Sequence, residues 1–128
     1  MNYWNTITEL DHDYMVRELV SYLDGNGFVG IQADIVGYNH PELIYWQNTG
    51  NGHIPDVVAQ KNRMTYLFEV ETVSTLTSEH SKSQRLLFTA NAKEHGKFFV
   101  LVVQASAKTD AELLLQQEGL PATVWTVG

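Results

Sequence analysis

Hydrophobic residues recur every three to four positions in three segments of this sequence, which is the spacing of an amphipathic helix. These segments are residues 8–25, 78–95 and 109–119. Elsewhere the apolar residues alternate with polar ones or form short continuous runs, as strands do. The predicted strands are residues 28–36, 57–59, 66–70, 97–103 and 122–127, with a short extra strand within 43–46. The continuous run at 97–103 is typical of a central strand that is covered on both faces.

The order of these elements predicts a fold. One helix precedes three strands, and helix, strand, helix and strand follow, so the order is α-β-β-β-α-β-α-β. This order predicts an α/β sandwich with a mixed central sheet flanked by helices, in one domain over residues 1–128. The strand-helix-strand unit between residues 66 and 103 is expected to be a parallel, right-handed crossover.

The segment 52–72 combines a predicted hairpin with three carboxylates. Glu69 and Glu71 are two residues apart on one strand, so their side chains point to the same face. A two-residue turn at 62–63 places Asp56 directly opposite Glu69, and a four-residue loop at 62–65 places Asp56 opposite Glu71. Both registers gather the three acids on one face, whereas an odd-length loop or a bulge would separate them.

Acids that share one face of a strand repel each other, and the apolar residues in 66–70 suggest a strand withdrawn from water. One interpretation is that a carboxyl stays protonated or a cation neutralises the group, with Mg²⁺ or Mn²⁺ the best-suited ions for oxygen ligands. The alternative is a sheet with one wet face, on which the acids are simply solvated.

Composition narrows the class of protein. The chain has 128 residues, 44% of them hydrophobic and 18% charged, as expected of a globular protein. It contains no cysteine, which excludes disulfides and thiolate chemistry. The sequence shows no signal-peptide pattern and no apolar run of membrane-spanning length, so we expect a cytoplasmic protein without membrane contact. The net charge of −7 argues against a general high-affinity DNA binder, although an acidic metal site contributes several of those charges itself.

In this element order, an opening helix with an acid, then Pro55-Asp56, then Glu69-Val70-Glu71 at a strand end resembles the PD-(D/E)xK nuclease superfamily. These restriction-endonuclease-like proteins include Holliday-junction resolvases and RecB-type nuclease domains. The resemblance covers most of the chain. It implies a restriction-endonuclease-like sandwich and a Mg²⁺- or Mn²⁺-dependent hydrolysis of phosphodiester bonds in nucleic acid, DNA in the first place.

The resemblance also assigns roles to residues. It makes Asp56 and Glu69 metal-binding carboxylates, together with the carbonyl of Val70. The family has lysine where this chain has Glu71, which is a departure from the pattern. Some restriction enzymes of the superfamily use a second glutamate there, so Glu71 is expected to position water or to ligate a second ion. Other members place the lysine elsewhere, and Lys82 is the candidate for that role.

Three further residues are candidates for the site. Glu18 matches the first-helix acid that many members add to the metal site, and Gln84 resembles the helix glutamine of the RecB-like branch. His53 precedes Asp56 by three residues and is a candidate substrate contact, the alternative being an exposed loop histidine. The five histidines are scattered and predict no zinc site. The arginines at positions 17, 63 and 85 are expected to be solvated.

Two functions from different classes follow. The first is a divalent-metal-dependent nuclease. The second is a catalytically degenerate protein of the same fold that acts as an interaction or dimerisation module, which the acidic charge and the missing lysine favour. The aromatic residues Tyr45 and Trp46 are expected to pack or to form an oligomer contact, so a homodimer is an expected partner.

Overall fold

A computed structural model describes residues 9–128. The helices are α1 (His12–Gly25), α2 (Glu79–His95) and α3 (Lys108–Glu118), with a short 3₁₀ turn at Ala105–Ala107. The strands are β1 (Val29–Ala33), β2 (Ile44–Tyr45), β3 (Gly52–His53), β4 (Val57–Lys61), β5 (Met64–Val70), β6 (Phe98–Gln104) and β7 (Thr123–Val127). The predicted order of helices and strands is confirmed, with the polar segment before the hairpin contributing two short strands.

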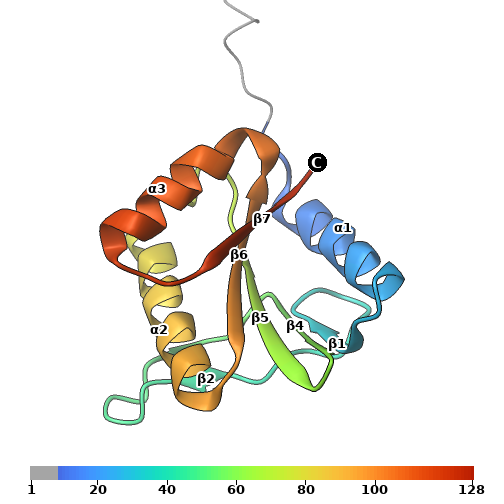
Figure 1. Cartoon of the computed structure of the whole chain (residues 1–128), viewed down its shortest axis with the longest axis horizontal. Coiled ribbons are helices and arrows are strands. Elements are labelled where there is room, and N and C mark those ends of the chain that lie inside the picture. The colour runs from blue at the N-terminus through green and yellow to red at the C-terminus, as the bar shows by residue number, and fades with distance from the viewer. Residues whose placement is uncertain (1–8) are drawn as a thin grey trace, which may run out of the picture.

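The central sheet has five strands in the order β1-β4-β5-β6-β7. Strands β1, β4 and β5 form an antiparallel meander, while β5, β6 and β7 run parallel to one another. The sheet is therefore mixed, as the sequence predicts, and α2 and α3 are the crossovers that parallel neighbours require. Figure 1 shows α1 on one side of this sheet and α2 with α3 on the other.

Different core residues cover the two faces of the sheet. On one face, α1 packs on a group that includes Phe68, Val70 and Val102. On the other face, α2 covers Leu67 and α3 covers Leu101. Along β5, Leu67 therefore faces α2 while Phe68 and Val70 face α1, because neighbouring residues of a strand point to opposite faces of the sheet. The molecule is thus a three-layer sandwich with a helix layer on each side of the sheet.

The hairpin β4–β5 has the two-residue turn. Lys61 is paired with Met64, and the register continues to Val57 opposite Phe68. The turn residues Asn62 and Arg63 both have positive φ, 52° and 68°. Two consecutive positive φ angles define the type I′ turn, whose twist matches that of the strands it joins. Of the two registers open from the sequence, the structure has the one that places Asp56 opposite Glu69.

Several boundaries differ from those expected. Helix α1 begins at His12 and is capped by Asp11, whose carboxylate accepts a hydrogen bond from Tyr14 N, while the N-cap expected at Thr8 lies outside the described residues. Helix α3 begins at Lys108, before the expected cap at Thr109, because the 3₁₀ turn leads into it. Helix α2 has its expected cap, Ser78, and ends as expected at a glycine in the left-handed conformation.

Arg85 is not solvated, contrary to expectation. Its side chain is 1% exposed and makes two hydrogen bonds to Glu118, at 2.8 and 2.7 Å, and a third to Leu76 O at 2.9 Å. The guanidinium therefore links α2 to the end of α3 through a paired charge that makes three hydrogen bonds.

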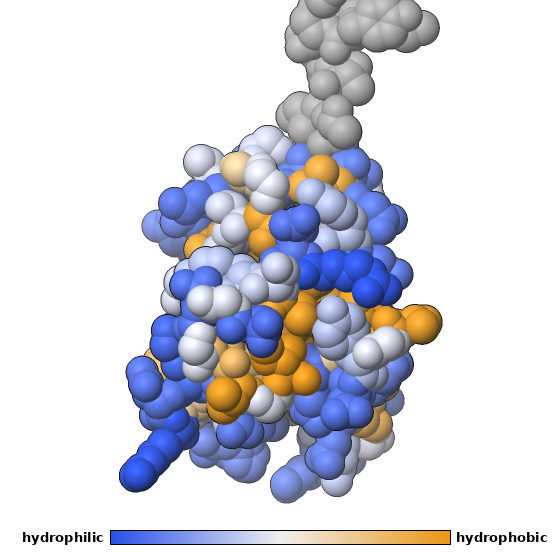
Figure 2. Space-filling view, turned by 90° about the vertical axis from the view of Figure 1, so that its right-hand side faces the viewer, coloured by the Kyte–Doolittle hydropathy of each residue, from blue (hydrophilic) through white to orange (hydrophobic). Residues whose placement is uncertain are grey.

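The edges and surface show two further features. Strand β1 is an edge strand and contains a bulge, with a register shift between Val29 and Gln32 and a positive φ at Gly30. Figure 2 shows the side of the molecule on the right of Figure 1, where a central group of hydrophobic residues is surrounded by hydrophilic ones. None of the helices within residues 9–128 has the length and apolar character that a bilayer span needs.

Candidate functional site

The three predicted acids come together at one end of the sheet. Asp56 immediately precedes β4. Glu69 is the last residue but one of β5, and Glu71 follows that strand directly. Glu69 and Glu71 alternate with Phe68 and Val70, which pack against α1, so the two glutamates point to the α2 side. All three acids are buried, with exposed fractions of 8% for Asp56, 2% for Glu69 and 3% for Glu71. A solvated wet face is therefore not what surrounds them.

Asp56 is the ionised member of the group. Its carboxylate accepts a hydrogen bond from Val70 N at 2.7 Å and lies 3.1 Å from His12 Nε2. Burial alone would raise the pKa of Asp56, but hydrogen bonds with Glu69, His12 and Val70 N lower it below its ordinary value. The hairpin and the start of α1 thus hold this carboxylate in one orientation.

Glu69 is the member whose surroundings favour the protonated form. Burial and the neighbouring charge of Asp56 raise the pKa of Glu69 well above its ordinary value, with the charges of Glu71 and Asp34 adding to the effect. Its Oε2 atom is buried and has no hydrogen-bond partner within residues 9–128. A buried oxygen without a partner is costly in a folded protein, and it is available to a ligand.

Glu71 is held by hydroxyl groups on the loop between β5 and α2 and on α2 itself. Its Oε2 accepts hydrogen bonds from Thr75 Oγ1 and Ser81 Oγ, each at 2.7 Å. Burial raises the pKa of Glu71, and these two hydrogen bonds act in the opposite direction. The first turn of α2 therefore fixes the glutamate that stands at the lysine position of the family pattern.

Two residues at this site could not be predicted from the sequence. His12 is the first residue of α1, and its hydrogen bond to Asp56 raises the pKa of the imidazole to about 9 in spite of partial burial. Asp34 follows β1, and its backbone N–H donates to Asp56 O at 2.9 Å. Both lie far from the hairpin in sequence, so only the packing of α1 and β1 against the sheet brings them here.

Two of the predicted site residues lie elsewhere. Glu18 is exposed on α1 and lines a cavity with Tyr22 and Lys108, and its charge raises the pKa of Tyr14. Lys82 is exposed on α2 and lines a different cavity, between α2 and α3. Glu18 projects from the flank of α1, while the first residue of that helix, His12, is the one that contacts the acids. On α2, Ser81 faces Glu71, and Lys82 points to the outside of the helix.

His53 and Gln84 both belong to the α2 side of the sheet. His53 Nε2 lies 3.1 Å from Ser83 Oγ, and its ring packs edge-to-face on His80 and Phe88. Gln84 is half-buried on α2, one turn beyond Ser81 and therefore on the same side of the helix. His53 thus contacts the first half of α2, and no contact joins it to Asp56 in the described structure.

The donor set of this cluster suits a hard divalent ion in its chemistry. Asp56, Glu69 and Glu71 offer carboxylate oxygens, and one oxygen of Glu69 has no other partner. In the described conformation, residues 9–128 contain no three His, Asp or Glu side chains arranged to hold a metal ion together. Hydrogen bonds occupy one oxygen of Glu71 and both oxygens of Asp56, so an ion would have to share or replace these contacts.

Comparison with known proteins gives no match. Neither a protein-family model, nor a curated protein, nor a solved structure matches this chain. The acidic cluster must therefore be interpreted from its own geometry.

Proposed function

We propose that this protein is a divalent-metal-dependent phosphodiesterase of the nuclease type, with a restriction-endonuclease-like sandwich fold and with DNA as its substrate. The observation that carries the proposal is the register of the hairpin, which places Asp56 directly opposite Glu69 in a buried group with Glu71. Directly opposed side chains on neighbouring strands have Cβ atoms only ~5 Å apart. Buried acids at this distance repel one another, and a bound cation offsets that repulsion.

In this proposal Asp56 and Glu69 hold Mg²⁺ or Mn²⁺, with the Val70 carbonyl as a further ligand. The bound ion supplies Lewis-acid chemistry, since it lowers the pKa of an attacking water and offsets charge on the phosphate. Val70 N–H keeps the Asp56 carboxylate in place for this role. Glu69 must release its proton to become a ligand, so metal binding is coupled to proton release. Glu71, held by Thr75 and Ser81, orients the water.

His12 contributes the positive charge that position 71 lacks. Lysine at position 71 would be a cation beside the acids, and this chain has a glutamate there. The imidazolium of His12 contacts Asp56 and reaches the group from α1. A cation in that position can attract the phosphate and stabilise charge that develops during hydrolysis. Lys82 and Glu18 have no part in this arrangement.

The experiment is a cleavage assay with supercoiled plasmid and with short oligonucleotides in Mg²⁺ or Mn²⁺. Wild type is expected to cut, and Asp56→Asn and Glu69→Gln to cut at least about 100-fold more slowly. Glu112→Gln, an exposed acid on α3, is the matched control and should cut like wild type. Wild-type activity in Glu69→Gln would place the chemistry elsewhere, and no cleavage by wild type would remove the catalytic proposal.

A second function is favoured by one observation, the balance of charge within the cluster. His12 lies 3.1 Å from Asp56, and burial raises the pKa of Glu69, which favours its neutral form, so both features reduce the net negative charge of the cluster without a metal ion. The alternative proposal is a protein of the same fold without catalysis, which acts as an interaction or dimerisation module. It predicts no cleavage and no Mn²⁺ binding by wild type, together with a self-association that sedimentation can measure.

A further inference from the structure

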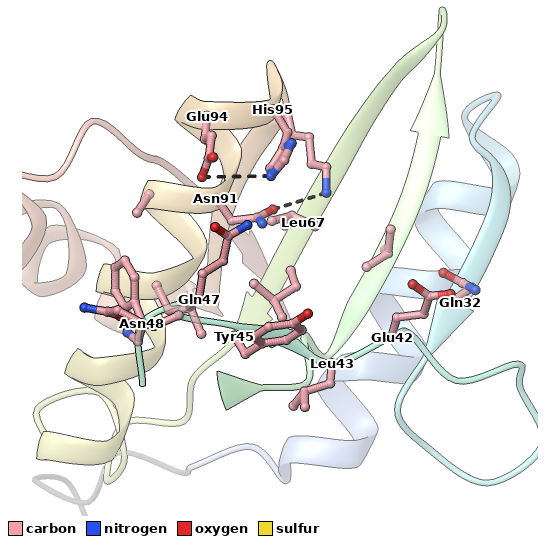
Figure 3. A pocket seen from close by; sticks show the side chains of 16 residues that line it. Gln32, Glu42, Leu43, Tyr45, Gln47, Asn48, Leu67, Asn91, Glu94 and His95 are labelled. Carbon is pink, nitrogen blue, oxygen red and sulfur yellow. Dashed lines mark hydrogen bonds and ion pairs between the residues drawn. The ribbon is translucent and has the colours of Figure 1, made fainter. Parts of the chain in front are cut away.

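A cavity of about 620 Å³ lies on the same side of the sheet as the acids. Its floor is formed by Val58 and Leu67, which are paired across β4 and β5, and by Leu87 of α2. Its outer wall is the segment of β2 and the turn that follows it, as Figure 3 shows. This volume is within the range of pockets that bind small ligands.

The chemistry of the lining is that of a site for a flat, uncharged, hydrogen-bonding ring. Gln32, Gln47 and Asn91 contribute carboxamides above the apolar floor, and Gln47 extends toward Asn91 from the opposite wall (Figure 3). Within residues 9–128, the Gln32 and Gln47 side chains make no hydrogen bond, and Asn91 uses only its oxygen, to Lys97 Nζ at 3.1 Å. A carboxamide can both donate and accept, as the edges of nucleobases require.

Aromatic side chains complete the cavity. Tyr45 is 55% exposed and Trp46 is 38% exposed, and both line it. The wall that carries them is fixed, because Trp46 N donates to Asn51 O at 2.9 Å and Trp46 O accepts from Gly50 N at 2.8 Å. Exposed aromatic rings on a fixed wall are the surfaces on which unpaired bases stack.

Charge decides which part of a nucleotide fits. The ionic residues of the lining are Glu42, Glu94 and Lys97, with His95 beside them. With the histidine neutral the sum is −1, which repels a phosphate but not an uncharged base. The phosphates would therefore stay outside the cavity while a base enters it.

The cavity lies next to the acids on the β4–β5 hairpin. Val58 and Leu67 form the pair next to Asp56 and Glu69 on the same face of the hairpin, about 7 Å further along the strands. A base in the cavity and a phosphodiester at the acids would thus belong to one strand, with His53 beside its path along α2.

We propose that this cavity binds an unpaired nucleobase of single-stranded DNA. The inference rests on the proposed function for the class of substrate, and it narrows that class from DNA in general to strands with an accessible base.

The test is fluorescence anisotropy of a labelled single-stranded oligonucleotide in EDTA, where no metal-dependent cleavage occurs. Wild type should bind the strand at least about tenfold more tightly than an abasic strand of equal length or a blunt duplex. Tyr45→Ser should weaken binding about tenfold, and Asn91→Leu about fivefold. Tyr22→Ser is the matched control, because Tyr22 is 53% exposed and lies outside this cavity, and it should bind like wild type.

Equal affinity for the abasic strand or for the duplex would overturn the proposal, as would wild-type affinity in both Tyr45→Ser and Asn91→Leu. An equal loss in Tyr22→Ser would do the same. Because no metal is present, the result is independent of cleavage. Strand binding that depends on Tyr45, in a protein that never cuts, would leave this inference standing while the catalytic proposal fails.

Discussion

His12 and Glu69 are the two residues that reduce the negative charge of the acidic cluster. One interpretation of the sequence is that the acids need a proton or a cation. In the structure, burial and the charge of Asp56 raise the pKa of Glu69, which favours its protonated form, and His12, whose pKa is raised to about 9, lies beside Asp56. That the acids share one face could be predicted, because the period of two gathers them in both registers that the sequence leaves open, and the two-residue turn selects the register that pairs Asp56 with Glu69. The histidine could not, because nothing in residues 11–13 indicates that the start of the helix reaches a strand 44 positions away.

Replacing His12 with glutamine should destabilise the protein in a pH-dependent way. The pKa of His12 is about 9 in the folded state and 6.5 in the reference state, so its stabilisation is complete below pH 6.5 and is lost as the pH rises through 9. The loss should be about 1 kcal/mol at most, because the side chain is 38% exposed and solvent screens its charge. Urea denaturation at about pH 6 and about pH 10 measures both differences. An equal loss at the two pH values would contradict a charged His12.

Glu69→Gln should stabilise the protein above the reference pKa of 4.5. The folded state raises the pKa of Glu69, so it retains a proton that the unfolded chain releases, and wild-type stability falls as the pH rises from 4.5. Glutamine carries no such cost. Thermal midpoints should therefore be similar at about pH 4, and at about pH 8 the variant should melt a few degrees higher. A lower midpoint for the variant at about pH 8 would show that Glu69 is ionised in the fold.

The hairpin β4–β5 is the element that assembles the site, and its turn is strained. Arg63 has a φ of 68°, a conformation in which the type I′ turn strongly favours glycine. Arg63→Gly should raise the free energy of unfolding by about 0.5–1 kcal/mol. Arg63→Ala removes the same side chain but keeps the Cβ atom, so it is the control and should show no gain. Denaturant unfolding measures both, and an equal gain in the two variants would attribute the effect to the side chain rather than to the turn.

Helices α2 and α3 are joined by the buried pair of Arg85 and Glu118. Removing the arginine alone, in Arg85→Met, leaves Glu118 without its partner and should cost about 3–5 kcal/mol. The double variant Arg85→Met/Glu118→Leu removes both charges and should recover most of that loss. Chemical denaturation of wild type, the two single variants Arg85→Met and Glu118→Leu, and the double variant tests this, and an additive loss in the double variant would argue against a coupled pair. The helix pattern predicted both helices, but not that an arginine on one is buried against the other.

At the scale of the whole molecule, the order of elements was the most informative part of the sequence. The apolar run at residues 97–103 predicted the central strand, and the crossover between residues 66 and 103 predicted a parallel neighbour on one side of it. The structure adds a parallel neighbour on the other side, β7. What the sequence left open is where the ends of distant elements meet. The start of α1, the first turn of α2 and the end of β5 converge on the acids, and this convergence arises from packing of the layers and not from any local pattern.

Calorimetry with Mn²⁺ near neutral pH tests whether the opposed acids Asp56 and Glu69 bind a metal ion. We expect wild type to bind the ion with release of a proton, detected as a dependence of the heat on buffer, and Asp56→Asn and Glu69→Gln not to bind it. The control Glu112→Gln should bind like wild type. No binding by wild type, or equal binding by wild type and Glu69→Gln, would contradict the claim that the opposed pair Asp56 and Glu69 is a metal site.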